Sequence, residues 1–192
     1  MILNLALARE GMSQKDLKDG TAANIAASGI VSAAITKQVA AVGIWTVLAE
    51  EIKKQIGEEN YVILAESRDF YPEYVFPGSW VVHPKFLENN PEAVKSFLKA
   101  LVKANEFRAH NKEESVEMTA EFDGSDVAAG LVNYDNAKWL NNEELKEAYT
   151  SGMVSRWYEG LQEMFVETGI MNEVVPVDQF VDTEIILGAF EE

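Results

Sequence analysis

The chain contains no cysteine, and only two of its 192 residues are histidine. Without cysteine it forms no disulfide, has no thiolate nucleophile and cannot bind a metal through sulfur. This fits an extracytoplasmic protein of a bacterium that avoids disulfides, and it fits a cytosolic protein equally well. His83 and His110 are widely separated in the sequence, and we interpret both as structural or solvent-facing rather than as ligands.

Recognisable catalytic motifs are also missing. The sequence has no phosphate-cradling loop, no dinucleotide-binding glycine pattern, no zinc-protease helix, no serine-hydrolase elbow and no calcium loop. Acidic pairs do occur, but chance pairs are expected among 32 carboxylates, so none is assigned as a general acid or base. The sequence therefore predicts no catalytic residue, no metal, no cofactor and no enzymatic activity.

Long apolar runs are scarce as well. The most apolar window, from Thr21 to Trp45, is rich in small residues and is interrupted by Lys37 and Gln38, so it is not a convincing membrane span. Residues 1–10 lack a basic start and become charged early, and they do not have the pattern of a signal peptide.

Basic residues are outnumbered two to one. With 16 lysines and arginines against 32 aspartates and glutamates, the formal charge is −16. Such a surface repels phosphate backbones and anionic membrane faces, so we expect no nucleic-acid partner. The hydrophobic fraction of 47% nevertheless indicates a soluble globular protein with a real core.

The first part of the chain is typical of an α/β layer. The apolar runs at residues 39–45, 61–65 and 79–83 are interpreted as buried parallel strands. An amphipathic helix is expected at residues 46–56, ended by Gly57. Short helical segments are expected at residues 3–11 and 21–34, and Ser13 with Asp16 has the spacing of a capping box.

The second part is expected to be helical throughout. A long helix begins at Asn90-Pro91, with proline at its first position, and runs to about His110. Further helical segments are predicted at residues 113–122, 125–132, 143–148, 153–168 and 178–190.

Candidate ligand-binding residues follow the predicted strands. Open α/β sheets bind ligands at the carboxyl ends of their strands, and aromatic, hydroxyl, charged and turn residues gather there in this sequence. Trp45 is also compatible with a purely structural role, and Phe70 is more typical of core. The candidates are Trp45, Thr46, Ser67, Arg68, Asp69, Phe70 and Gly78.

The same region resembles a known family. Residues 38–46 (QVAAVGIWT), 62–67 (VILAES), 76–82 (FPGSWVV) and 86–95 (FLENNPEAVK) are similar, in order and spacing, to segments of solute-binding proteins for sulfonate, taurine and nitrate importers. Looser similarity continues at residues 139–146 and 169–171, so nearly the whole chain is covered. Ala40 stands where the family usually has aspartate, and Val47 where it often has proline.

The resemblance implies an incomplete type II periplasmic-binding-protein fold, with this chain as the C-terminal part. Residues 1–82 would form most of the α/β lobe two, and residues 83–192 a helical portion that normally packs on lobe one. Lobe one and the opening strand of lobe two have no counterpart in the sequence. Helices without that partner would expose apolar residues such as Val94, Leu98 and Leu101, so we expect either self-association or a rearrangement that covers them.

By resemblance, the expected function is extracytoplasmic binding of a small, anionic organic solute that is passed to an ABC-transporter permease. Trp45 would stack on the solute, Ser67 and Gly78 would donate hydrogen bonds, and Asp69 would orient an amine or a loop. Arg68 would pair with an anionic group if it points inward. Alternatives are a ligand-sensing or interaction module made of one lobe, and an enzyme like the thiamine-pyrimidine synthases. A periplasmic or extracellular location requires a signal or anchor in the missing part, and a chain made as it stands would be cytoplasmic.

Overall fold

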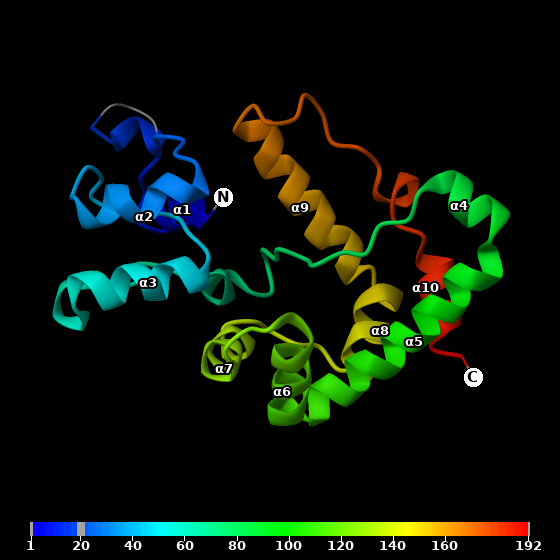
Figure 1. Cartoon of the computed structure of the whole chain (residues 1–192). Coiled ribbons are helices and arrows are strands. Elements are labelled where there is room, and N and C mark those ends of the chain that lie inside the picture. Colours follow the sequence, from blue (N-terminus) through cyan, green and yellow to red (C-terminus); the bar gives the residue numbers. More distant parts are fainter. Residues whose placement is uncertain (1, 19–21, 192) are drawn as a thin grey trace. The chain divides into compact units, whose positions relative to one another are not determined.

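The computed structural model describes residues 2–18 and 22–191. The chain divides into two compact units, Met1–Phe70 and Tyr71–Glu192 (Figure 1). The assignment of residues 1–82 and 83–192 to two parts of a binding protein stays a prediction, and the units are considered separately below.

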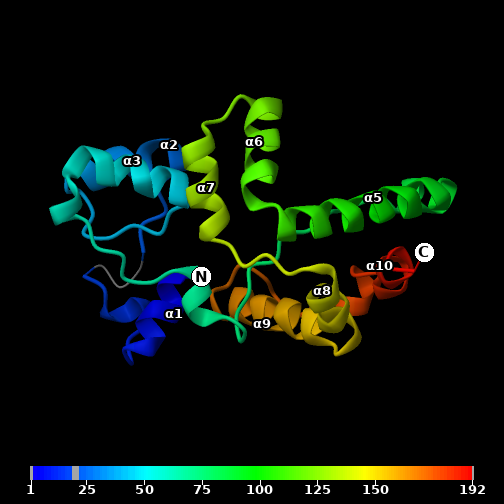
Figure 2. The ribbon, with the colours of Figure 1, turned by 90° about the horizontal axis from the view of Figure 1, so that it is seen from below.

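The described part of the first unit contains three α-helices, of which α2 and α3 pack side by side (Figures 1 and 2). Ala33 of α2 and Ile52 of α3 are its buried apolar side chains among the described residues. Gly57 ends α3 with a φ of +87°, a conformation that side chains with a Cβ rarely adopt. The elements are α1 (Ile2–Arg9), α2 (Ala27–Ile35), α3 (Thr46–Ile56) and the 3₁₀ turns η1 (Gln14–Asp16), η2 (Glu58–Asn60) and η3 (Ser67–Phe70).

The second unit is a group of helices, most of them joined by short loops, with a longer connection between α9 and α10. Helix α6 packs against α7, α8 against α9, and α5 against both α10 and α8 (Figure 2). Its core is built around Ala148, Val154 and Trp157, where α8 and α9 meet. The helices are α4 (Pro84–Asn89), α5 (Pro91–His110), α6 (Lys112–Asp123), α7 (Val127–Asp135), α8 (Asn142–Thr150), α9 (Met153–Glu167) and α10 (Thr183–Ala189), with the 3₁₀ turn η4 (Val177–Gln179).

A polar clamp holds the start of α8 to α5. The guanidinium of Arg108 lies 4.0 Å from the centre of the Trp139 ring, and burial lowers the pKa of Arg108. Asn105 donates to the carbonyl oxygen of Leu140 at 2.9 Å, and Asn142 donates to that of Val102, also at 2.9 Å. These side chains fix residues 139–142, which lead into the pocket described below.

The prediction of an α/β fold is wrong, because the described residues contain no strand. Residues 39–45, 61–65 and 79–83 are instead irregular, apart from a bend at residues 39–40. A strand exists only when a neighbouring strand completes its hydrogen-bond ladder. Within the described ranges these three runs have no such neighbour. Their apolar side chains are therefore exposed: Val62 by 76%, Leu64 by 68% and Val81 by 93%.

The helical predictions are confirmed where local signals defined them. Helix α3 has the predicted bounds, α5 starts at the predicted proline, and Ser13 and Asp16 form the expected capping box. The helix expected at residues 21–34 begins later, at Ala27, and residue 21 lies outside the described residues. Helix α4 was not predicted; it begins after His83, whose Nδ1 accepts a hydrogen bond from the Lys85 amide at 3.2 Å.

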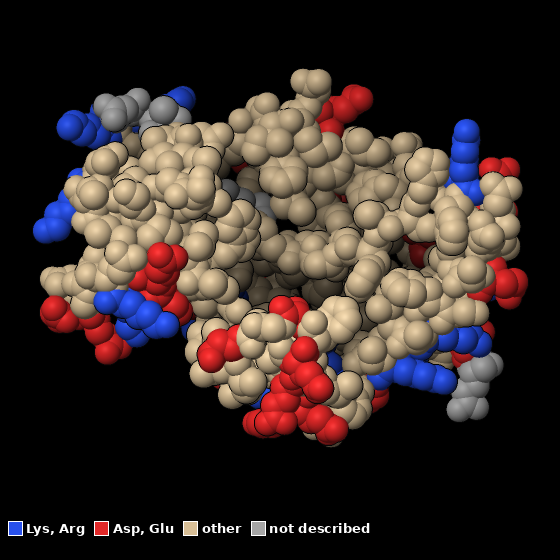
Figure 3. Space-filling view, in the orientation of Figure 1, with Lys and Arg blue, Asp and Glu red and all other residues tan. Residues whose placement is uncertain are grey.

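Acidic side chains gather over α6 and α7 on the face shown in Figure 3. Helix α6 alone carries Glu113, Glu114, Glu117, Glu121 and Asp123. Among the described residues, no helix combines the length and apolar character needed to cross a membrane.

Candidate functional site

Trp45 and Thr46 lie at the start of α3. Trp45 is the N-cap residue, its side chain makes no capping hydrogen bond, and 73% of its surface is exposed. Thr46, the first helical residue, is partly buried. An indole held at a helix start and open to solvent is available for stacking against a planar or apolar group.

The other candidates of the first unit form the turn η3. Asp69 Oδ2 accepts a hydrogen bond from the amide of Glu66 at 2.9 Å, which closes the turn. Arg68 Nε donates to Glu66 Oε2, also at 2.9 Å, so this guanidinium is already paired with a carboxylate. Phe70 lies under the guanidinium of Arg9, 5.8 Å from the ring centre. Asp69 and Arg68 thus have local structural partners.

No contact among the described residues joins the seven candidate residues into one site. Among the described residues, no hydrogen bond, ion pair or ring contact links Trp45 or Thr46 to the turn η3. Gly78 belongs to the second unit and is exposed. A single binding wall made of all seven residues stays a prediction.

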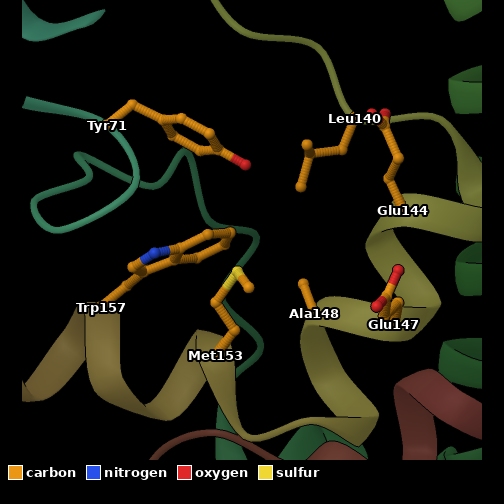
Figure 4. A pocket seen from close by; sticks show the side chains of 7 residues that line it. All are labelled: Tyr71, Leu140, Glu144, Glu147, Ala148, Met153 and Trp157. Carbon is orange, nitrogen blue, oxygen red and sulfur yellow. The ribbon is translucent and has the colours of Figure 1, made fainter. Parts of the chain in front are cut away.

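A pocket that sequence reasoning missed lies in the second unit. It encloses about 200 Å³ and is lined by residues of α8, α9 and two loops (Figure 4). Tyr71 and Trp157 form one side, with Met153 below them, while the other side comes from the loop before α8 and from α8 itself. The lining residues are Tyr71, Leu140, Glu144, Glu147, Ala148, Met153 and Trp157.

The aromatic side of the pocket is held in place by a hydrogen bond. Trp157 is 6% exposed, and its indole N–H donates to the carbonyl oxygen of Pro72 at 2.9 Å. The ring centres of Tyr71 and Trp157 are 6.3 Å apart with the planes tilted by 48°. Tyr158, the residue that follows Trp157 in α9, shares a hydrogen bond with Ser79. The indole therefore has a fixed orientation next to a partly exposed tyrosine.

Two carboxylates from α8 line the opposite side. Glu144 Oε2 accepts from the Asn141 amide at 2.9 Å, and Oε1 accepts from Lys138 Nζ at 3.1 Å. The Asn141 amide, and to a lesser degree Lys138, lower the pKa of Glu144, because both favour its charged form. Glu147, one turn on, is exposed, and within the described parts of the chain its carboxylate has no basic partner.

The spacing of residues in the sequence indicates part of this pocket. Met153 and Trp157 are four residues apart, as are Glu144 and Ala148, so each pair lies on one helix face. Tyr71 is far away in the sequence and nothing local relates it to α9. The pocket could therefore not be assembled without knowing how the loop at Pro72 packs.

Comparisons with known proteins define the family. The NMT1/THI5 like family matches residues 1–115, and the chain belongs to it. The chain is 36% identical over 169 residues to proteins provisionally named as binding proteins in Brucella abortus (strain 2308), Brucella suis biovar 1 (strain 1330) and Brucella melitensis biotype 1. Each alignment covers 88% of this chain and 51% of the relative, so the chain spans about half the length of these proteins. No solved structure matches it significantly.

Proposed function

We propose that this chain is part of a protein that binds a small solute. The observation that carries the proposal is its 36% identity, over 88% of its length, to proteins named for binding. Membership of the NMT1/THI5 like family supports the same conclusion.

The finer proposal is that the solute is a small, anionic organic molecule such as a sulfonate or taurine, bound outside the cytoplasm and passed to an ABC-transporter permease. It is supported by the similarity of residues 38–46 and 86–95 to the sulfonate, taurine and nitrate binding proteins. Residues 1–82 would belong to one lobe of such a protein and residues 83–192 to its helical portion.

In this proposal Trp45 is the central binding residue. Its exposed indole is free to stack on the solute, Thr46 and Ser67 of the same unit offer hydroxyl donors, and Gly78 of the second unit offers a backbone amide. Because Arg68 is paired with Glu66, an anion would have to share or replace that carboxylate. The acidic partner lowers the expected affinity for an anion and makes Arg68 the position where anion specificity can be tested.

Calorimetric titration with taurine, alkanesulfonates, nitrate and thiamine-precursor pyrimidines tests the proposal. We expect Trp45→Ala to weaken binding of the active compound at least fivefold, which corresponds to about 1 kcal/mol. Trp80→Ala is the matched control, because Trp80 is 74% exposed and lies outside the proposed wall. Equal binding by wild type and Trp45→Ala would remove Trp45 from the site, and no binding of any compound to the folded protein would contradict the proposal.

An enzymatic role like that of the thiamine-pyrimidine synthases is the second candidate, and the family match favours considering it. Its expected histidine and cysteine-rich motifs have no counterpart here: His83 caps α4, and His110 ends α5 with Nδ1 2.9 Å from the Glu106 carbonyl oxygen. Formation of a pyrimidine product by iron-supplemented protein would establish this role in place of simple binding.

We also propose self-association through an apolar surface of the helical part. Trp80 stacks edge-on against Phe97 of α5, with ring centres 5.4 Å apart, and both are at least half exposed. With the neighbouring Val81 they form what we term the Trp80–Phe97 patch. Val94, which would lack cover without lobe one, is only 8% exposed on α5, which packs against α10, and Leu98 and Leu101 are partly buried.

A further inference from the structure

The pocket between α8 and α9 has two chemically different sides. One side presents an indole and a phenol, and Trp157 cannot turn away without losing its hydrogen bond to Pro72. The lining of the other side includes two acidic residues of α8, Glu144 and Glu147 (Figure 4). Aromatic faces and carboxylates share one preference, since both attract positive charge.

The two carboxylates differ in how far their charge is already neutralised. Glu144 is engaged at both oxygens, by Asn141 and by Lys138. Glu147 has no such partner among the described residues, and its backbone is fixed in the middle of α8. Glu147 is therefore the group with an uncompensated charge at this pocket.

The volume limits what can enter. About 200 Å³ is below the roughly 300–1,000 Å³ typical of pockets for drug-sized ligands, so the occupant must be small. The remaining lining of Leu140, Ala148 and Met153 is apolar, which favours methyl or methylene groups over a heavily hydrated ion. A compact organic cation with an apolar shell satisfies all of these features.

We propose that this pocket binds a small organic cation of the alkylammonium or methylated ammonium class. The cation rests against the Tyr71 and Trp157 rings, and Glu147 supplies the balancing charge. The site lies wholly within the second unit and does not involve the proposed wall at Trp45. It is therefore a second binding site, of opposite charge preference to the first.

Calorimetry at low ionic strength with choline and with its neutral isostere 3,3-dimethylbutan-1-ol tests the proposal on the full chain. The two compounds have nearly the same shape, so only charge separates them. We expect choline to bind roughly tenfold more tightly, from ring and carboxylate contributions together. Equal affinity for the two compounds, or no choline binding to the folded protein, would overturn the proposal.

Variants separate the pocket from general attraction to an acidic surface. Glu147→Gln should weaken choline binding roughly two- to fivefold, whereas Glu143→Gln, on the same helix but outside the pocket, should leave it unchanged. Tyr71→Leu should also weaken binding, and Tyr71→Phe, which keeps the ring, should not. If Glu143→Gln and Glu147→Gln have the same effect, the cation is held by surface charge and the pocket is not its site. Circular dichroism of each variant confirms that the fold is retained.

Discussion

At the scale of single residues, Glu144 performs two tasks with one carboxylate. It completes a capping box, in which its amide donates to Asn141 Oδ1 and its Oε2 accepts from the Asn141 amide, both at 2.9 Å. The same side chain lines the pocket beside Leu140. The start of α8 and one side of the pocket therefore depend on the same charge.

This dual role leads to a prediction for Glu144→Gln. The variant should be less stable at about pH 7 by roughly 0.5–1 kcal/mol, the usual range for a cap at a partly exposed site. Because folding lowers the pKa of Glu144, its charge stabilises the native state above the ordinary carboxyl pKa of about 4.3. That contribution is lost as the pH falls through the lowered pKa, so the two proteins should converge in stability in acid.

Urea unfolding at several pH values measures this difference. Glu143→Gln is the control, since its exposed side chain takes no part in the box and its substitution should have a smaller effect. A stability gap between wild type and Glu144→Gln that stays constant from neutral to acidic pH would show that the charge is not responsible.

At the scale of elements, two helical glycines have opposite surroundings. A Cβ added to Gly130 of α7 would lie 2.7 Å from Cγ1 of Val116, a buried residue of α6, whereas one added to Gly160 of α9 would meet nothing within 4 Å. Alanine is a better helix former than glycine by about 0.5–1 kcal/mol. The local preference and the packing thus agree at Gly160 and conflict at Gly130.

We therefore expect Gly160→Ala to stabilise the protein by about 0.5–1 kcal/mol. Gly130→Ala should destabilise it by about 1–3 kcal/mol, because α6 and α7 must separate or Val116 must change its rotamer. Thermal unfolding of both variants measures whether each substitution raises or lowers the stability of the protein. A stabilised Gly130→Ala would mean that α6 and α7 do not pack as closely as described.

The elements also show what could be predicted from the sequence and what could not. Helices such as α3 and α5 carry their signals within their own residues, in apolar spacing, Pro91 and Gly57, and these predictions are confirmed. The run at residues 61–65 is as apolar as a buried strand, but a strand is defined by a neighbour that no local pattern reveals. The pocket was missed for the same reason, because Tyr71 joins α9 only through tertiary packing.

At the scale of the whole molecule, a strong negative charge opposes an exposed apolar surface. The net charge of −16 keeps copies apart, while the Trp80–Phe97 patch favours contact between them. Repulsion between distant surface charges is screened by salt, and burial of apolar groups is not. Association between copies should therefore be controlled by ionic strength.

Sedimentation velocity at increasing protein and salt concentration tests this balance. We expect self-association that grows with salt, and we expect Val81→Glu to suppress it. Phe122→Glu is a matched control, because Val81 and Phe122 are both 93% exposed but only Val81 belongs to the patch. A monomer under all conditions would contradict the proposal. If both variants suppress self-association equally, the added negative charge is responsible and the Trp80–Phe97 patch is not the contact surface.

The distribution of the tryptophans has a spectroscopic consequence for this two-unit chain. Trp45 is the single tryptophan of residues 1–70, and it is open to solvent, while Trp157 of the second unit is only 6% exposed. Solvent exposure shifts indole emission to longer wavelength and opens the ring to soluble quenchers. The red, quenchable part of the fluorescence comes chiefly from the exposed Trp45 and Trp80, with a smaller part from the half-buried Trp139. Replacing Trp80 and Trp139 with phenylalanine would therefore leave Trp45 as an optical probe of the first unit.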